Sequence, residues 1–293
     1  TNSAGRNDSA GRNDSPRGRD SARRIDSCTS RHHDAGRHGG TRAAPDAPGF
    51  DALGLTATLR RAVQHAGYRE PTPIQQQTIP LVLQGRDVLG CAQTGTGKTA
   101  AFALPILHRM LTGERRRGRP PIQALVLAPT RELAAQIGES FGTYARGSGL
   151  RGLVVFGGVG KGPQIASLRK GVDVLVATPG RLLDLMNMGM VDLGQVRYLV
   201  LDEADRMLDM GFIHDVRRIM RAVPEERQTM LYSATMPGEI RKLAGSILTD
   251  PVRVAVDPVA STVEPIEQSV YFINSSQKAE FLLKLLRGDG IDR

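Results

Sequence analysis

The fold is decided by the stretch Ala92-Gln93-Thr94-Gly95-Thr96-Gly97-Lys98-Thr99. A short apolar run, Val88–Cys91, precedes it, and a helix-like run at 100–104 follows it. A strand, a glycine-rich loop and a helix in this order are the context of a phosphate-binding loop, because glycines without a Cβ let successive N–H groups converge on one anion. Position 92 is alanine where the strict pattern has glycine. A glycine-rich turn that ends in Lys-Thr by chance is the alternative, and the agreement of strand, loop and helix argues against it.

We expect residues 92–99 to hold the phosphates of a nucleotide. The helix N-terminus after the loop places partial positive charge where phosphates would lie. The Lys98 amine can reach the terminal phosphates, and the Thr99 hydroxyl can ligate Mg²⁺. The loop therefore predicts a nucleoside triphosphate with its magnesium ion as the ligand.

The composition allows a large folded core and an anionic partner. The chain has 293 residues, of which 40% are hydrophobic, and it carries a net charge of +9 with a pI of about 10.0. A polyanion fits that charge, although many proteins with a modest positive balance bind no nucleic acid. Of the two cysteines, Cys28 lies in a polar tail and Cys91 lies beside the glycine-rich loop. This placement argues against a disulfide and favours a reducing cytoplasm. No membrane span and no signal peptide is expected, and a first residue other than Met suggests a processed or truncated end.

Residues 1–47 are expected to be a disordered low-complexity tail. The sequence of 3–8 recurs at 9–14, and Arg, Asp, Ser and Gly dominate without any aromatic residue. Such a segment cannot bury enough apolar surface to offset the entropy lost on ordering. An arginine-rich arm for RNA is one interpretation, but the interspersed Asp residues favour a solvated tail. The three histidines of the tail have no neighbouring cysteine, and no metal site is expected there.

Beyond the tail, apolar runs alternate with helical segments. The runs lie at 88–91, 124–128, 153–156, 172–177, 198–201 and 229–232. Continuous apolar strands are buried on both faces, which predicts an α/β fold with a mostly parallel sheet covered by helices on both sides. In such sheets ligands bind outside the carboxyl ends of the strands. The polar residues directly after those ends therefore carry the functional information.

Acidic residues follow the run at 198–201. Asp202, Glu203 and Asp205 come directly behind its four large apolar residues. Beside a phosphate-binding loop, Asp202 would hold Mg²⁺ through water, and Glu203 would orient or deprotonate the attacking water. We therefore expect Lys98, Asp202 and Glu203 to be the catalytic residues. A surface acidic cluster is the alternative.

Three further strand ends carry groups that suit a sugar–phosphate backbone. They are Pro129-Thr130-Arg131, Gly157-Gly158 and Thr178-Pro179-Gly180-Arg181. Each offers a hydroxyl, backbone N–H groups or a guanidinium, and together on one edge they predict a groove for RNA. Singly, the threonines could be helix N-caps and the arginines exposed. The hydroxyls of Ser233 and Thr235 could bond Asp205 and couple the nucleotide site to this groove, with a simple turn as the alternative.

The segment 67–75 contains two prolines, which stiffen the turn by fixing φ. A stiff turn can hold Tyr68 to stack on a base and Gln75 to make paired hydrogen bonds to an adenine edge. Read alone, the segment fits a capped helix start with a packed tyrosine better. The basic connector 113–121 could contact RNA phosphates, but a solvated surface loop is the simpler interpretation.

With these residues the chain resembles the DEAD-box RNA helicases, and most of all the bacterial RhlE-type members. The resemblance covers residues 50–293. It rests on seven elements in the family's order, namely 67–75 with Phe50 as the upstream aromatic residue, 92–99, 129–134, 157–158, 178–181, 202–205 and 233–235. The literal Asp-Glu-Ala-Asp at 202–205 separates it from relatives with another spelling at that position.

The resemblance implies a RecA-like ATP-binding domain over residues 48–257. It implies RNA-stimulated ATP hydrolysis coupled to local unwinding of RNA, and adenine recognition by Gln75 with Tyr68 and Phe50. It implies contacts with the RNA backbone, so little base readout is expected. Protein partners, such as those of ribosome assembly or RNA decay, are not defined by the sequence. The resemblance assigns the contacts with the RNA backbone to Thr130, Arg131, Gly158, Thr178 and Arg181.

Residues 258–293 depart from the family's pattern. A linker at 257–265 leads to an expected strand at 269–273 and an expected helix at Lys278–Leu286, as at the start of a second RecA-like domain. The arginine fingers of that second domain are missing, and such a finger contributes about 10³–10⁵-fold in related phosphoryl transfer. We expect ATP and RNA binding with little turnover alone. A non-catalytic nucleotide- and RNA-binding module is the alternative, and a DNA translocase is disfavoured by Gln75 and the Asp-Glu-Ala-Asp spelling.

Overall fold

The computed structural model describes residues 49–113, 118–256 and 270–287. The predicted tail at 1–47, with Cys28, lies outside the described residues, as do 114–117 of the basic connector and the predicted linker at 257–265.

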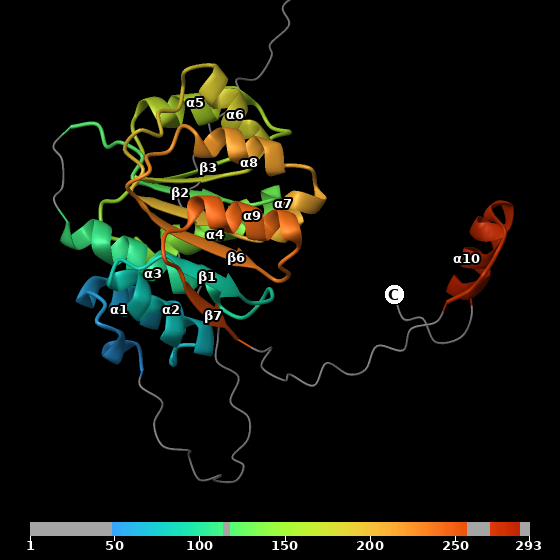
Figure 1. The fold of residues 1–293 in the computed structure, drawn as a ribbon, viewed down its shortest axis with the longest axis horizontal. Coiled ribbons are helices and arrows are strands. Elements are labelled where there is room, and N and C mark those ends of the chain that lie inside the picture. The colour runs from blue at the N-terminus through green and yellow to red at the C-terminus, as the bar shows by residue number, and fades with distance from the viewer. Residues whose placement is uncertain (1–48, 114–117, 257–269, 288–293) are drawn as a thin grey trace, which may run out of the picture. The chain divides into compact units, whose positions relative to one another are not determined.

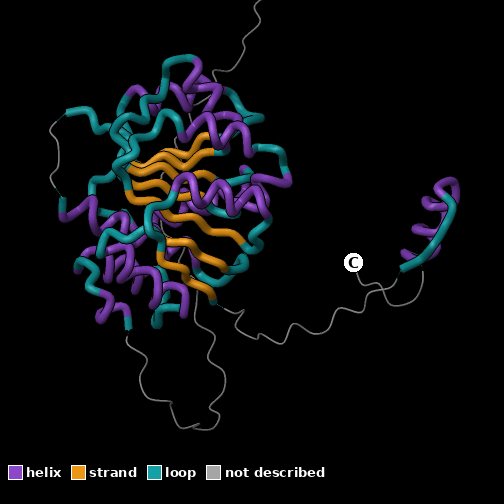
Figure 2. Tube along the Cα trace, viewed as in Figure 1, coloured by secondary structure: helices purple, strands orange, loops and turns teal. Residues whose placement is uncertain are grey.

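Among the described residues, seven strands form one parallel sheet in the order β3-β4-β2-β5-β6-β1-β7 (Figures 1 and 2). Each neighbouring pair is parallel. The six predicted strands are all present, which confirms the parallel α/β fold. The strands are β1 Val88–Cys91, β2 Ala124–Leu127, β3 Gly152–Val155, β4 Val174–Ala177, β5 Tyr198–Leu201, β6 Gln228–Ser233 and β7 Val252–Ala255.

Helices cover both faces of the sheet (Figure 1). Tyr198 and Val200 of β5 pack into one apolar cluster, and Leu199 and Leu201 pack into the other, because successive side chains of a strand point to opposite faces. The first cluster includes helices α1 Ala57–His65, α2 Pro73–Leu83, α3 Lys98–Thr112 and α4 Arg131–Tyr144, with the short 3₁₀ helix η1 Phe50–Leu53. The second includes α5 Lys161–Arg169, α6 Pro179–Asn187, α7 Ala204–Asp209, α8 Ile213–Met220 and α9 Gly238–Ile247.

Two expectations about strands need correction. β7 was not predicted, because its four residues include the exposed Arg253 and it lies at the edge of the sheet beside β1. The strand predicted at 269–273 is absent from its described part, 270–273, which has no regular structure. Val270 is 80% exposed and Phe272 is 97% exposed, and no described strand pairs with them. The helix predicted just after it is present as α10 Lys278–Leu286, preceded by the 3₁₀ turn η2 Ser275–Gln277.

We predict opposite effects for two glycine substitutions. Gly90 of β1 faces the buried Tyr232 ring, and a Cβ added there would overlap the ring carbons. Gly90→Ala should therefore lower the free energy of unfolding by about 1–3 kcal/mol. Gly142, inside α4, has nothing within 4 Å of an added Cβ, so Gly142→Ala should raise it by about 0.5–1 kcal/mol. Urea denaturation of both variants measures this, and equal midpoints would contradict the packing at Gly90.

Candidate nucleotide site and nucleic-acid groove

The phosphate-binding loop joins β1 to α3 in the predicted order. Gly95 and Gly97 have φ values of 82° and 96°, in the left-handed region that favours glycine. α3 begins at Lys98, which is 7% exposed. The Lys98 ammonium donates hydrogen bonds to the carbonyl oxygens of Ala92 at 3.1 Å and Gln93 at 2.8 Å. The loop therefore has its curved shape with the lysine already inside it.

Lys98 and Asp202 line the same cavity, of about 750 Å³. This is the juxtaposition that the sequence predicts, because β6 alone separates β1 from β5 in the sheet. Thr99, the other expected magnesium ligand, also lines it. The lining consists of Tyr68, Thr72, Gln75, Thr94, Gly95, Gly97, Lys98, Thr99, Ala100, Thr130, Glu132, Leu133, Gln136, Ser140, Tyr144, Asp202, Glu203 and Arg206.

The carboxylates at the end of β5 are buried and close to one another. Burial raises the pKa of Asp202 to about 6, against the Lys98 charge, which lowers it, while Glu203 raises it further. The Glu203 N–H donates to the Asp202 carboxylate at 3.1 Å, and the Glu203 carboxylate pairs with Arg206 at 3.3 Å. Glu203 has a φ of 53°, rare for a residue with a side chain. A strained residue at a buried carboxylate pair fits a functional turn between β5 and α7.

Gln75 touches the phosphate-binding loop. Its side-chain oxygen accepts from the Thr72 N–H at 3.0 Å, and its amide nitrogen donates to the Gly97 carbonyl at 3.1 Å. A Cβ at Gly97 would lie 2.5 Å from that nitrogen and 2.8 Å from the Thr72 hydroxyl oxygen. Each amide end keeps capacity for a second hydrogen bond. Gln75 therefore takes part in the cap of α2, as expected, and also lines the cavity. Its role in reading adenine stays a prediction.

The two expected aromatic residues differ in their placement. Tyr68 is 45% exposed and lines the cavity, with its ring centroid 6.4 Å from that of Tyr144. Phe50 lies in the core instead, because η1 buries Phe50 and Leu53 in the cluster that includes α2. The structure therefore does not bring Phe50 into the cavity lining. Ala92, Gln93 and Thr96 of the loop are also outside that lining.

One wall of the cavity was missed by the sequence analysis. Glu132, Gln136, Ser140 and Tyr144 of α4 all line it. Their spacing of four residues places them along one side of the helix. That spacing of polar and aromatic residues is visible in the sequence, but nothing local shows which neighbour the stripe faces.

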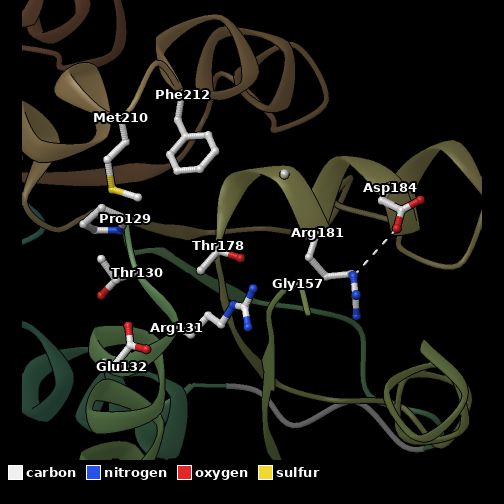
Figure 3. Close-up of a pocket in the computed structure, with 11 residues that line it drawn as sticks. Pro129, Thr130, Arg131, Glu132, Gly157, Thr178, Arg181, Asp184, Met210 and Phe212 are labelled. Carbon is white, nitrogen blue, oxygen red and sulfur yellow. Dashed lines mark ion pairs between the residues drawn. The ribbon is translucent and has the colours of Figure 1, made fainter. Parts of the chain in front are cut away.

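A second cavity, of about 520 Å³, lies at the neighbouring strand ends (Figure 3). It takes in seven of the nine residues predicted to contact RNA, and Gly158 and Pro179 are outside its lining. Thr130 and Glu132 line both cavities. The lining consists of Pro129, Thr130, Arg131, Glu132, Gly157, Thr178, Gly180, Arg181, Asp184, Met210 and Phe212.

Gly158 and Pro179 have structural reasons for their positions beside this cavity. A Cβ at Gly158 would overlap the Arg131 guanidinium, so the glycine leaves room for that side chain. Pro179 is the first residue of α6, where a proline is well tolerated because that N–H has no helical partner. The Thr130 hydroxyl caps α4 by accepting from the Leu133 N–H at 3.2 Å, whereas the Thr178 side chain makes no such cap.

The two arginines of the groove differ in their surroundings. Arg181 is buried, with 9% of its surface exposed, although the sequence alone allows an exposed side chain. Its guanidinium donates to the Val159 carbonyl at 2.9 Å and lies 3.7 Å from the Asp184 carboxylate. Asp184 also pairs with Lys161 at 2.7 Å. Arg131 has no hydrogen-bond or ion-pair partner among the residues that the structure describes. The Arg131 guanidinium is therefore available to a ligand in the groove, and Arg181 keeps one unpaired guanidinium nitrogen, Nη1.

The contacts expected between Asp205 and the 233–235 segment are present. The Thr235 N–H and hydroxyl both donate to the Asp205 carboxylate at 2.8 Å, and the Asp205 N–H donates to the Ser233 hydroxyl at 3.1 Å. Burial alone would raise the pKa of Asp205, but the hydrogen bonds from Thr235 and Ser233 outweigh it and lower the pKa. This network ties the ends of β5 and β6 together, and its coupling role stays a prediction.

Residues 72–243 match the DEAD/DEAH box helicase family, and the chain belongs to that family. DEAD-box ATP-dependent RNA helicase 52A of Oryza sativa subsp. japonica is 43% identical over 86% of this chain and 44% of its own length. ATP-dependent RNA helicase CshA of Limosilactobacillus reuteri is 44% identical over 81% of this chain and 47% of its own length.

A solved structure agrees with these relatives. The crystal structure of a DEAD box protein from the hyperthermophile Methanococcus jannaschii is similar, with a TM-score of 0.67 and 38% identity over 82% of this chain and 63% of that chain. The present chain spans less than half the length of the two curated relatives. Bacterial members are among the similar proteins, and the RhlE-type subgroup stays a prediction. None of the helices described for this chain has the length and apolar character that a membrane span requires.

Proposed function

We propose that this chain supplies the ATP-binding domain and part of the RNA-binding surface of an ATP-dependent RNA helicase. The observation that carries the proposal is the shared lining of the two cavities. Lys98 and the Asp202–Glu203 carboxylates lie in one, Arg131 and Arg181 lie in the other, and Thr130 and Glu132 belong to both. A triphosphate and a sugar–phosphate strand would therefore bind side by side.

The residues of the nucleotide cavity suit magnesium. Burial, the largest cause, raises the pKa of Asp202 to about 6, and the opposing charge of Lys98 offsets this only in part. A divalent cation would supply the missing positive charge, and Mg²⁺ is held in proteins by one or two carboxylates, water and substrate phosphates. Asp202 and the Thr99 hydroxyl would hold the ion. When bound, magnesium neutralises charge on the phosphates.

The protein's own groups have separate roles in this proposal. Lys98 would exchange its bonds to loop carbonyls for the terminal phosphates, at an N-terminus of α3 that already favours anions. Glu203 would accept a proton from, or orient, the attacking water, and Arg206 would hold its carboxylate in place. In the groove, Arg131, Arg181 and Thr178 would contact phosphate and ribose. Asp205, Ser233 and Thr235 would transmit changes between the two sites.

Direct binding measurements test the proposal. The chain should bind a fluorescent ATP analogue only when Mg²⁺ is present, and it should bind single-stranded RNA with an affinity that falls as salt rises. Failure to bind either ligand would contradict the proposal. Binding of both ligands, without hydrolysis even when a second helicase domain is joined to the chain, would favour the non-catalytic module.

The free thiol of Cys91 is consistent with a reducing cytoplasm, which we propose as the location.

Gln75 tests the adenine-reading part of the proposal. Gln75→Ala should reduce the preference for ATP over GTP, because a hydrogen-bonded edge discriminates between bases by about 1–3 kcal/mol. Competition between ATP and GTP for the bound fluorescent analogue measures this preference. Gln76→Ala is a matched control, since the Gln76 amide donates to the Pro71 carbonyl at 3.0 Å and is not part of the cavity lining. An unaltered preference for ATP over GTP in Gln75→Ala would exclude Gln75 from adenine recognition.

A further inference from the structure

The groove in Figure 3 has two chemically different sides. Thr130 and Arg131 lie on one side, and the Phe212 ring and the Met210 thioether lie across the cavity from them. Contacts with phosphate and ribose require hydroxyls, N–H groups and cations, which the first side offers. Contacts with the RNA backbone alone do not explain an aromatic ring and a thioether on the other side.

The backbone fixes both apolar side chains at this position. α7 ends at Asp209, and Gly211, with a φ of 80°, turns the chain toward α8. The Gly211 N–H donates to the Leu208 carbonyl at 2.9 Å, and the Phe212 N–H donates to the Met207 carbonyl at 2.8 Å. The turn that presents Met210 and Phe212 is therefore tied to the preceding helix.

Neither of these two side chains is fully buried in the core. Met210 is 48% exposed. Phe212 is partly buried, packs against one of the two core clusters, and places its ring edge 4.0 Å from the Cβ position of Gly180 in the groove lining. Together with Pro129 beside them, Met210 and Phe212 give the cavity an apolar side that faces its cations, which indicates a ligand with an apolar face.

We propose that Met210 and Phe212 form a stacking site for one unstacked base of single-stranded RNA. The inference rests on the proposed function and names a subsite within its groove. The phosphates would lie on the Arg131 side and the base face on the Phe212 ring, with the Met210 sulfur at the edge. Every base has a π-face, so such a site adds affinity without sequence preference. It also favours single strands, because the bases of a duplex are already stacked and paired.

A comparison of two oligomers tests the stacking site. One is a short oligouridylate, and the other is a ribose–phosphate chain of the same length without bases. Removal of the bases should weaken binding to the unmodified chain about 5–150-fold, the range that base–aromatic stacking gives on alanine substitution. Phe212→Leu, which keeps apolar bulk against the core, should weaken oligouridylate binding and shrink the effect of base removal. Fluorescence anisotropy measures each affinity.

Met210→Ala provides a second variant that does not disturb the core, should Phe212→Leu fail to fold in a thermal melt. It should also shrink the effect of base removal. Its matched control is Met188→Ala, because Met188 is similarly exposed at 44% and is outside the groove lining. The Met188 variant should bind both oligomers as the unmodified chain does.

The outcomes separate this inference from the function on which it rests. Arg131→Gln should weaken both oligomers by the same factor, since it removes a phosphate contact. If the unmodified chain binds neither oligomer, the proposed function fails and the stacking site fails with it. If Arg131→Gln acts as expected while Phe212→Leu and Met210→Ala leave the effect of base removal unchanged, the stacking site alone is overturned.

Discussion

Glu203→Gln is expected to lower the rate of ATP hydrolysis about 10²–10⁴-fold, the range that a positioned general base contributes. The amide has nearly the size of the carboxylate but cannot accept a proton from water at neutral pH. Binding of Mg·ATP should be unchanged, because Lys98 and the loop are untouched. The measurement is RNA-stimulated phosphate release by the chain joined to a second helicase domain, since the sequence predicts little turnover without one.

Glu239→Gln is the matched control for that experiment. Glu239 lies on α9, where it pairs with Arg217 and Lys242 at 2.9 Å, and it is not part of either cavity lining described above. Its variant should hydrolyse ATP at the unmodified rate. Normal hydrolysis by Glu203→Gln would remove Glu203 from the reaction and leave Asp202 or bound water as the base.

Lys98→Ala should weaken Mg·ATP binding by about 1.5–3 kcal/mol, the range for a hydrogen bond to a charged group, which corresponds to roughly 10–150-fold. The Lys98 ammonium already lies within the loop, bonded to the carbonyls of Ala92 and Gln93, so it needs little rearrangement to meet a phosphate. Titration of a fluorescent ATP analogue measures the loss.

The same substitution also removes two hydrogen bonds from the loop, and a thermal melt must accompany the titration. Lys242→Ala is the control, because Lys242 is an exposed lysine on α9 with a single ion pair to Glu239. It should bind Mg·ATP with the unmodified affinity. A folded Lys98→Ala variant that does the same would exclude a phosphate-binding role for Lys98.

The parts of the site that the sequence predicts are those encoded locally. The loop 92–99 carries its strand, glycines and helix within one continuous stretch, and the carboxylates at 202–205 follow an apolar strand directly. Their meeting in one cavity follows from a single rule, that parallel strands present their carboxyl ends at one edge.

The parts of the site that the sequence does not show depend on distant neighbours. The adenine-binding role of Phe50 comes only from the resemblance, and the structure buries Phe50 in the core cluster outside the cavity lining. The α4 residues from Glu132 to Tyr144 have a visible periodicity, yet only the fold shows that the stripe faces the nucleotide cavity. No local motif marks Phe212 and Met210 as groove residues, and the turn at Gly211 precedes their place in the lining.

Thr130 and Glu132 belong to the walls of both cavities, at the start of α4. A ligand in one cavity would therefore touch residues that also line the other, in addition to the proposed link through Asp205, Ser233 and Thr235. Thermodynamic reciprocity then applies: if bound nucleotide tightened RNA binding tenfold, RNA would tighten nucleotide binding tenfold, a linkage of about 1.4 kcal/mol in each direction. A side-chain change at either residue should alter this mutual dependence together with the two affinities, because both side chains line both cavities.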